Sequence, residues 1–233
     1  MLISLTISVA LLAQQSVADL DAEFKEKTLQ FQQDMEQMFE TGEFKEIVDP
    51  ISIYYPKFRE LAKNNSIEKS ERCMAQLWCM RNFSGKVWGN PNEVFDSLAS
   101  LFVKEFSNDS AAEEMPEIIR NVTTVDKKQR NMILKTLRIT TKSEKVKARC
   151  FATTALIELD NNNFEGATNA ANQFLEQYAG TEYAYLVEPI SIQGKLQIGK
   201  QAPTLTGEDV HGNQLSLESA LGKVTYVVFW GFW

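Results

Sequence analysis

The chain has 233 residues, of which 44% are hydrophobic and 24% are charged, with a formal net charge of −7. This composition is typical of a globular protein and excludes a disordered or collagen-like chain. The acidic balance argues against a nucleic-acid-binding protein, which normally needs a basic surface to neutralise phosphates.

The first 18 residues carry the pattern of an export signal. Leu2 to Ala13 is an apolar run, and residues 16–18 (Ser-Val-Ala) form a small-x-small cleavage pattern before an aspartate. We therefore expect a signal peptide, 1–18, cleaved after Ala18, and an exported protein that is periplasmic or secreted. A bilayer-spanning helix needs about 20 apolar residues, so no transmembrane anchor is expected. The alternative is a buried first helix.

Helical periodicity runs through residues 19–195 almost without interruption. In the first predicted helix, apolar side chains recur at steps of three and four residues, and Gly42 is expected to end it. This apolar face consists of Leu20, Phe24, Phe31, Met35, Met38 and Phe39.

Capping residues mark later helix starts. Asn90, Pro91 and Glu93 provide a side-chain acceptor, a proline at the first helical position and a carboxylate at the third. Ser110 and Glu113 repeat the capping pattern. Further helices are predicted at residues 66–82, 127–139, 144–160 and 163–179. Six or more helices joined by short polar loops predict an all-α array, which forms an N-terminal domain over residues 19–195.

The last two of these helices resemble a tetratricopeptide-type helical hairpin. The resemblance rests on Ala155–Leu159, Asn163–Ala167 and Phe174–Thr181. Small side chains at Ala167 and Ala171 would let the two helices approach closely. An ordinary helical hairpin explains the pattern equally well. A single unit cannot bury its own apolar face, so we expect it to pack on the preceding helices.

Three cysteines do not form a dense disulfide framework. Cys73 and Cys79 lie six residues apart in a predicted helix, where the chain turns by about 600°, so the two sulfurs point to different faces. They cannot bridge to each other within one helix. We interpret both, and Cys150, as small buried hydrophobic residues. A long-range disulfide from Cys150 to one of the others is the alternative.

After residue 194 glycines and prolines become frequent, and the sequence predicts strands. Thr204–Val210 and Asn213–Leu217 are predicted to pair through a turn at His211-Gly212, followed by a short helical turn at Leu217–Leu221. Val224–Trp230 is an apolar, β-branched and aromatic run typical of a strand covered on both faces. The predicted fold class is therefore mainly α, with a C-terminal partial α/β segment of one hairpin and one central strand.

This C-terminal stretch is similar to the start of TlpA-like redoxin domains, relatives of the peroxiredoxins (the AhpC-TSA group) within the thioredoxin fold. The residues that carry the resemblance are Ile198–Pro203, Gly207–Asn213, Leu215–Leu217, Gly222–Val224 and Val227–Trp233. The aromatic residues at 229, 230 and 233 favour the disulfide-reductase branch over the peroxidase branch.

The resemblance implies a Cys-x-x-Cys motif directly after Trp233, at a helix N-terminus that lowers the cysteine pKa. Trp233 would be an active-site neighbour, and residues 196–233 would be the truncated start of a redoxin domain. The chain would then be a fragment of an exported thiol–disulfide oxidoreductase that acts on protein thiols or disulfides. An isolated peroxidatic cysteine at the same place would indicate a peroxidase instead.

Two alternatives stay open. The chain could be a non-catalytic helical-repeat protein that binds a partner, and Val224–Trp233 could pack on the array as a terminal strand or apolar plug. His211 is the only histidine and lies in a predicted turn, so no metal site is expected. No phosphate-binding glycine loop is present, and no cofactor is expected. The sequons, which matter only in a host that glycosylates secreted proteins, begin at Asn64, Asn82, Asn108 and Asn121.

Overall fold

The computed structural model describes residues 16–83, 90–194, 199, 201–202, 204–222, 224–228 and 230–231. Within these residues the protein has nine α-helices and one two-stranded antiparallel sheet near the C-terminus. The predicted mainly α fold class, with a C-terminal hairpin, is therefore confirmed.

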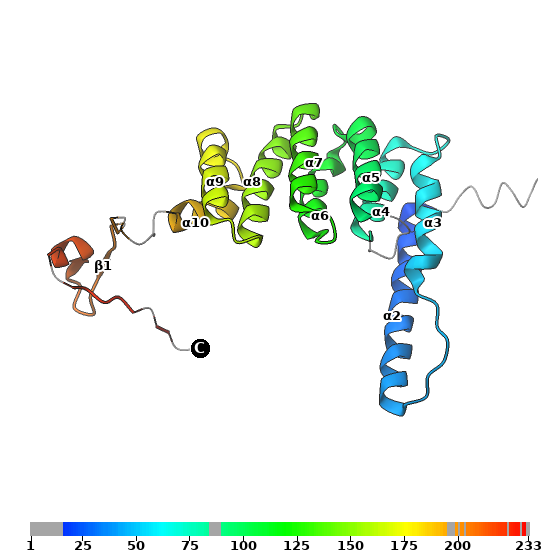
Figure 1. Ribbon diagram of the computed structural model, residues 1–233, viewed down its shortest axis with the longest axis horizontal. Coiled ribbons are helices and arrows are strands. Elements are labelled where there is room, and N and C mark those ends of the chain that lie inside the picture. The colour runs from blue at the N-terminus through cyan, green and yellow to red at the C-terminus, as the bar shows by residue number, and fades with distance from the viewer. Residues whose placement is uncertain are drawn as a thin grey trace, which may run out of the picture.

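Successive helices lie side by side and form an elongated array, with α2 and α3 at one end and α9 and α10 at the other (Figure 1). The helices are α2 (Val17–Thr41), α3 (Pro50–Lys63), α4 (Lys69–Arg81), α5 (Pro91–Phe106), α6 (Met115–Asn121), α7 (Lys127–Thr140), α8 (Glu144–Asp160), α9 (Phe164–Tyr178) and α10 (Ala184–Gln193). A short 3-10 helix, η2 (Ser110–Glu114), precedes α6.

Local capping chemistry sets both ends of α2. The Ser16 hydroxyl accepts from the backbone N–H of Asp19, whose carboxylate accepts from Ser16 in return. Gly42 ends the helix with a φ of 72°, a left-handed conformation that favours glycine, as the sequence predicts. The predicted cleavage point after Ala18 therefore falls within the first turn of this helix.

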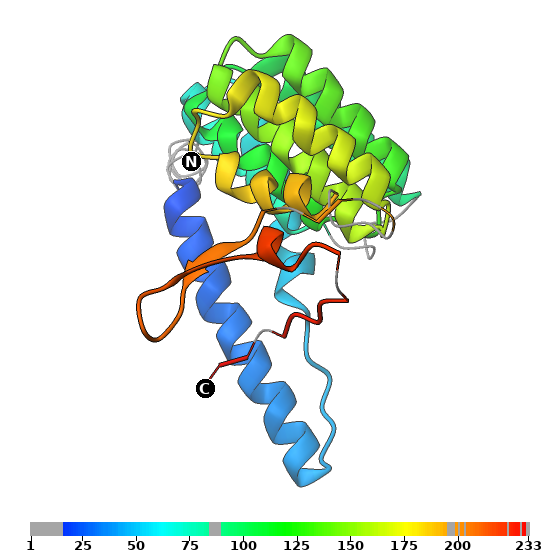
Figure 2. The ribbon, with the colours of Figure 1, turned by 90° about the vertical axis from the view of Figure 1, so that its left-hand side faces the viewer.

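The apolar face predicted for α2 is only partly covered. Leu20 is buried, and the Phe24 ring lies edge-on to Trp78 with centroids 4.9 Å apart. Phe39, further along, is 71% exposed. Figures 1 and 2 show why, since the second half of α2 projects beyond the other helices. We call this half and the segment that returns from it to α3, residues 29–49, the arm.

Two apolar clusters follow one another along the array. The larger cluster joins α2–α7 to one side of α8, and Phe58 stacks on Trp78 within it at 3.7 Å between ring centroids. The smaller cluster joins α8, α9 and α10. Because α8 contributes to both clusters, it links the two parts of the array.

The predicted α8–α9 hairpin is confirmed. Ala167 and Ala171 are fully buried, and α8 also packs against α7 and α6. Small side chains at this contact let the helices approach closely, and the preceding helices cover the remaining apolar face of α8. That the α8–α9 hairpin is a tetratricopeptide-type repeat unit stays a prediction.

Some local predictions differ from the structure. Asp109, not Ser110, caps η2, because the Asp109 carboxylate accepts from the N–H of Ala111 at 3.0 Å. Helices α3 and α10 were not predicted, and each contains an internal proline, Pro56 or Pro189, that weakens the helical signal.

The C-terminal hairpin is present but shorter than predicted. Strand β1 (Thr206–Glu208) pairs antiparallel with β2 (Gln214–Ser216), and a 3-10 helix, η3 (Leu217–Ala220), follows. The Asp209 carboxylate holds the turn by accepting from the backbone N–H groups of His211 and Asn213 at 2.8 and 2.9 Å.

The predicted central strand at Val224–Trp230 is wrong for the part that the structure describes. Residues 224–228 and 230 have no regular secondary structure and pair with neither β1 nor β2. Val224 is fully exposed and Tyr226 is 89% exposed. The alternative of an apolar plug is also wrong here, because neither cluster includes a described residue beyond Ile190. A strand needs a neighbouring strand for its ladder of backbone hydrogen bonds, and the sheet of the described residues contains only β1 and β2.

Candidate functional site

The predicted active-site neighbour, Trp233, lies outside the described residues, as does Ile198 at the start of the resemblance. The hairpin, the helical turn and the extended apolar segment that follows are described, and they occur in the predicted order. Trp233 is the one active-site residue that the resemblance predicts, so the described residues at this end of the chain include no predicted catalytic group.

All three cysteines are buried inside the array as free thiols, which confirms their interpretation as small buried residues. The alternative of a disulfide from Cys150 is therefore wrong. Burial raises the pKa of Cys79 and of Cys150 to about 12. Burial, with the Asp109 carboxylate adding to it, raises the pKa of Cys73 to about 12. None of these thiols forms an appreciable amount of thiolate near neutral pH, so none can serve as a redox nucleophile.

His211 lies on the exposed hairpin turn. Within the described ranges, no three or more His, Cys, Asp or Glu side chains come together in a way that could hold a metal ion. Nor does any described helix combine the length and apolar character that crossing a bilayer requires.

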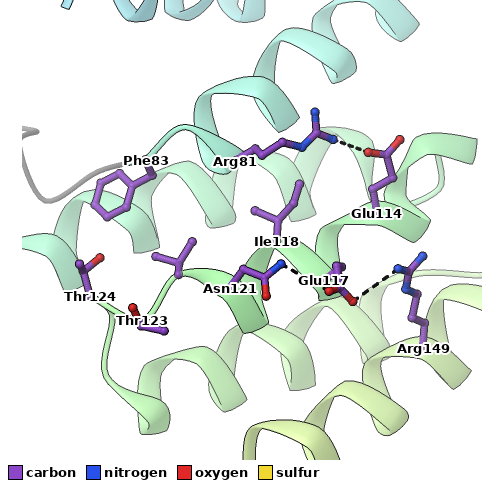
Figure 3. A pocket seen from close by; sticks show the side chains of 10 residues that line it. Arg81, Phe83, Glu114, Glu117, Ile118, Asn121, Thr123, Thr124 and Arg149 are labelled. Atoms are coloured by element: carbon purple, nitrogen blue, oxygen red, sulfur yellow. Dashed lines mark hydrogen bonds and ion pairs between the residues drawn. The ribbon is translucent and has the colours of Figure 1, made fainter. Parts of the chain in front are cut away.

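A depression with a volume of about 380 Å³ lies where the end of α4, η2, α6 and α8 meet. We call it the α6 pocket, because α6 forms its floor (Figure 3). Its lining combines two arginines, two glutamates, three polar and three apolar residues: Arg81, Arg149, Glu114, Glu117, Asn121, Thr123, Thr124, Phe83, Ile118 and Val122.

Ion pairs between helices set the positions of the pocket's charged side chains (Figure 3). Arg81 at the end of α4 donates to Glu114 at the end of η2. Arg149 on α8 lies 3.7 Å from Glu117 on α6, which also accepts from the Asn121 amide at 3.4 Å. Each guanidinium therefore has a carboxylate beside it, and the pocket has no net charge. Exposed pairs of this kind stabilise a fold by at most about 1 kcal/mol.

A second set of polar contacts continues beside the pocket towards α10. The Tyr183 hydroxyl donates to Glu113, and the Arg149 guanidinium lies 5.8 Å from the Tyr183 ring centroid. Lys145 pairs with Glu182 at 2.7 Å. Burial raises the pKa of Tyr183, and the Glu113 carboxylate raises it further, so this hydroxyl stays protonated. The contacts connect η2 and α8 with the start of α10.

This arrangement can bind polar groups, but it lacks the parts of a catalytic centre. Thr123 and Thr124 are its only hydroxyl-bearing residues, and the one histidine of the chain lies in the distant hairpin turn. A nucleophilic threonine needs an adjacent general base. No sequence pattern indicates the pocket, because its ion pairs join residues more than thirty positions apart.

Comparison of the chain with known protein families, curated proteins and solved structures finds no match. Fold and pocket together define a mainly α-helical array protein with a C-terminal hairpin. Its function must be inferred from its own residues.

Proposed function

We propose that this chain is the N-terminal part of an exported thiol–disulfide oxidoreductase, in which the helical array precedes a redoxin-type domain. The observation that carries the proposal is the exposed apolar segment after the hairpin. Val224, Tyr226 and Val228 are large apolar side chains in contact with solvent, although their β-branched and aromatic character suits a covered strand. Further elements of a redoxin sheet would cover them.

The cysteines of the array have no part in the proposed chemistry, because they are buried and protonated. The catalytic pair would come from sequence after Trp233. Its first thiolate would attack a sulfur of the substrate disulfide, forming a mixed disulfide and releasing one substrate thiolate. The second cysteine would then attack the mixed disulfide, leaving an oxidised enzyme and a fully reduced substrate.

Export is part of the same proposal, with residues 1–18 as the signal peptide. Cleavage after Ala18 would remove the Ser16 cap and the buried Val17 side chain from α2. Asp19 and Leu20 would then start the mature chain, and the first turn would lose one capping interaction.

A second candidate function is a non-catalytic partner-binding protein. The α6 pocket favours it, because the pocket offers paired guanidinium and carboxylate groups and no reactive group. In that case the C-terminal segment would be vestigial.

The test is the intact mass of the protein from its native source, with and without alkylation of the folded protein. Because Cys73, Cys79 and Cys150 are buried, native alkylation reports only on other thiols. A mass well above 26.4 kDa, with two alkylated cysteines beyond Trp233, would support the oxidoreductase. A mass of 26.4 kDa less the signal peptide would contradict it and favour the binding protein.

A further inference from the structure

The arm, residues 29–49, carries an apolar groove at the end of the array. The groove has a volume of about 350 Å³ and lies between α2, the returning segment and the start of α3. Phe31, Ile47, Val48 and Ile53 form its apolar walls. In Figures 1 and 2 the arm extends past the other helices, so no described helix covers its outer surface.

Large apolar side chains continue from the groove to the tip of the arm. Phe39 is 71% exposed and Phe44 is 75% exposed, and their rings lie edge-on with centroids 6.4 Å apart. Leu29 and Val48 are also exposed. Scattered exposed apolar residues are ordinary, but an exposed pair of aromatic rings on the same arm as an apolar groove is typical of an interaction site.

The arm is also the most acidic part of the molecule. Its six acidic side chains against one lysine give it a net charge of −5, out of −7 for the whole chain. The acidic residues are Asp34, Glu36, Glu40, Glu43, Glu46 and Asp49.

These charges are poorly compensated within the protein. The last turn of α2 contains no basic residue, so Glu40 lies at the negative end of the helix dipole. Lys45 pairs with Asp34 at 3.2 Å, whereas Glu36, Glu40, Glu43 and Glu46 form no ion pair within the described part of the chain. These carboxylates do not stabilise the free protein, but they would attract a cationic partner.

From this combination we propose that the arm is a docking surface for a basic amphipathic helix of a partner protein. The apolar side of such a helix would cover Phe39, Phe44 and the groove. Its lysines and arginines would lie over the carboxylates of Glu36, Glu40, Glu43 and Glu46. An amphipathic helix binds by laying its apolar face into an apolar groove, and complementary charge adds specificity and speeds association.

Charge also decides between this partner and a second copy of the chain. Two arms in contact would bring together two surfaces of net charge −5 each, and like charges at close range oppose association. Anionic lipid and nucleic acid are disfavoured for the same reason. A basic amphipathic protein segment matches both the apolar groove and the negative charge of the arm.

The probe for the test is a fluorescein-labelled synthetic peptide of about 18 residues, or about five helical turns, with leucines on one face and lysines on the other. Fluorescence anisotropy measures its binding to the full chain. Replacing Phe39 and Phe44 together by serine should weaken binding about tenfold, since aromatic anchors dominate such interfaces. The control Phe164→Ser removes a phenylalanine that is 53% exposed on α9, at the other end of the array, and should leave binding unchanged.

A second pair of variants separates docking from general attraction to an acidic protein. One replaces Glu36, Glu40, Glu43 and Glu46 by glutamine, and the other does the same at four exposed glutamates of the array, Glu93, Glu165, Glu176 and Glu188. Both have the same net charge, but only the arm variant should lose about tenfold in affinity and most of its salt dependence.

Equal losses in the two quadruple variants would overturn the proposal, because binding would then follow net charge alone. Equal binding of a peptide with glutamates in place of the lysines would overturn it too. Sedimentation equilibrium tests whether a second copy of the chain binds the arm instead. If the unmodified chain forms a dimer that Phe39→Ser dissociates, the second copy is the occupant and the proposal of a basic partner is contradicted.

Discussion

Helix α8 and residues 224–230 are both rich in apolar side chains, yet they have opposite fates. In α8, Cys150, Ala152, Ala155 and Ile157 are fully buried between neighbouring helices. In residues 224–230, the described apolar side chains are exposed. A helix satisfies its own backbone and needs only a surface to pack on, whereas a strand needs neighbours for its hydrogen bonds as well. Apolar content alone therefore does not determine burial.

The largest effect should come from the aromatic core. Phe58→Ala would leave a cavity beside Trp78, and we expect a loss of about 3–5 kcal/mol in the free energy of unfolding. Tyr226→Ala, in the exposed segment, should change it by less than about 0.5 kcal/mol. Urea denaturation followed by circular dichroism measures both. Similar losses would show that the C-terminal segment packs on the array.

A smaller effect is expected where α8 meets α9. Ala171→Leu would add volume to a fully buried contact and should cost about 1–3 kcal/mol. Ala22→Leu, on the exposed side of α2, provides the matched control and should be close to neutral. Thermal unfolding compares the two variants, and a neutral result for Ala171→Leu would mean that the helices do not approach closely there.

The buried thiols make stability depend on alkaline pH. The pKa of Cys79 is raised from 9.0 to about 12 in the folded protein. The contribution of this thiol to the free energy of unfolding is therefore complete below pH 9 and is lost as the pH rises towards 12. In this window the thiol accounts for a loss of about 1.4 kcal/mol per pH unit at most. Cys79→Ala should therefore show a shallower decline of stability between pH 9 and pH 11 than the unmodified chain. Parallel declines would indicate that Cys79 is accessible to solvent.

The smallest effect concerns the first turn of α2. Ser16→Ala removes the hydroxyl that accepts from the Asp19 N–H and should cost about 1 kcal/mol. Ser97→Ala, at an exposed position within α5 where the hydroxyl forms no hydrogen bond in the described part of the chain, serves as control and should not lower stability. Chemical denaturation of a chain that retains residue 16 measures the difference. No difference would mean that this turn is frayed in solution.

Sequence reasoning succeeded where the signal is local. Gly42 ends α2 and Asn90 caps α5, because each acts within one turn of the chain. It failed where the outcome depends on distant segments. The periodicity of α2 is uniform, but nothing local says that the array stops before Phe39. For the same reason no sequence pattern pointed to the pairing of Arg81 with Glu114 in the α6 pocket.

Hydrogen–deuterium exchange resolved by peptide can show whether a packed helical array precedes an uncovered apolar segment. We expect strong protection in α4, α5 and α8, and much weaker protection in residues 224–228, which form no strand and have largely exposed side chains. Protection of residues 224–228 comparable to that of α5 would contradict this expectation. It would show that this segment is covered and that its exposed side chains cannot support the proposed redoxin domain.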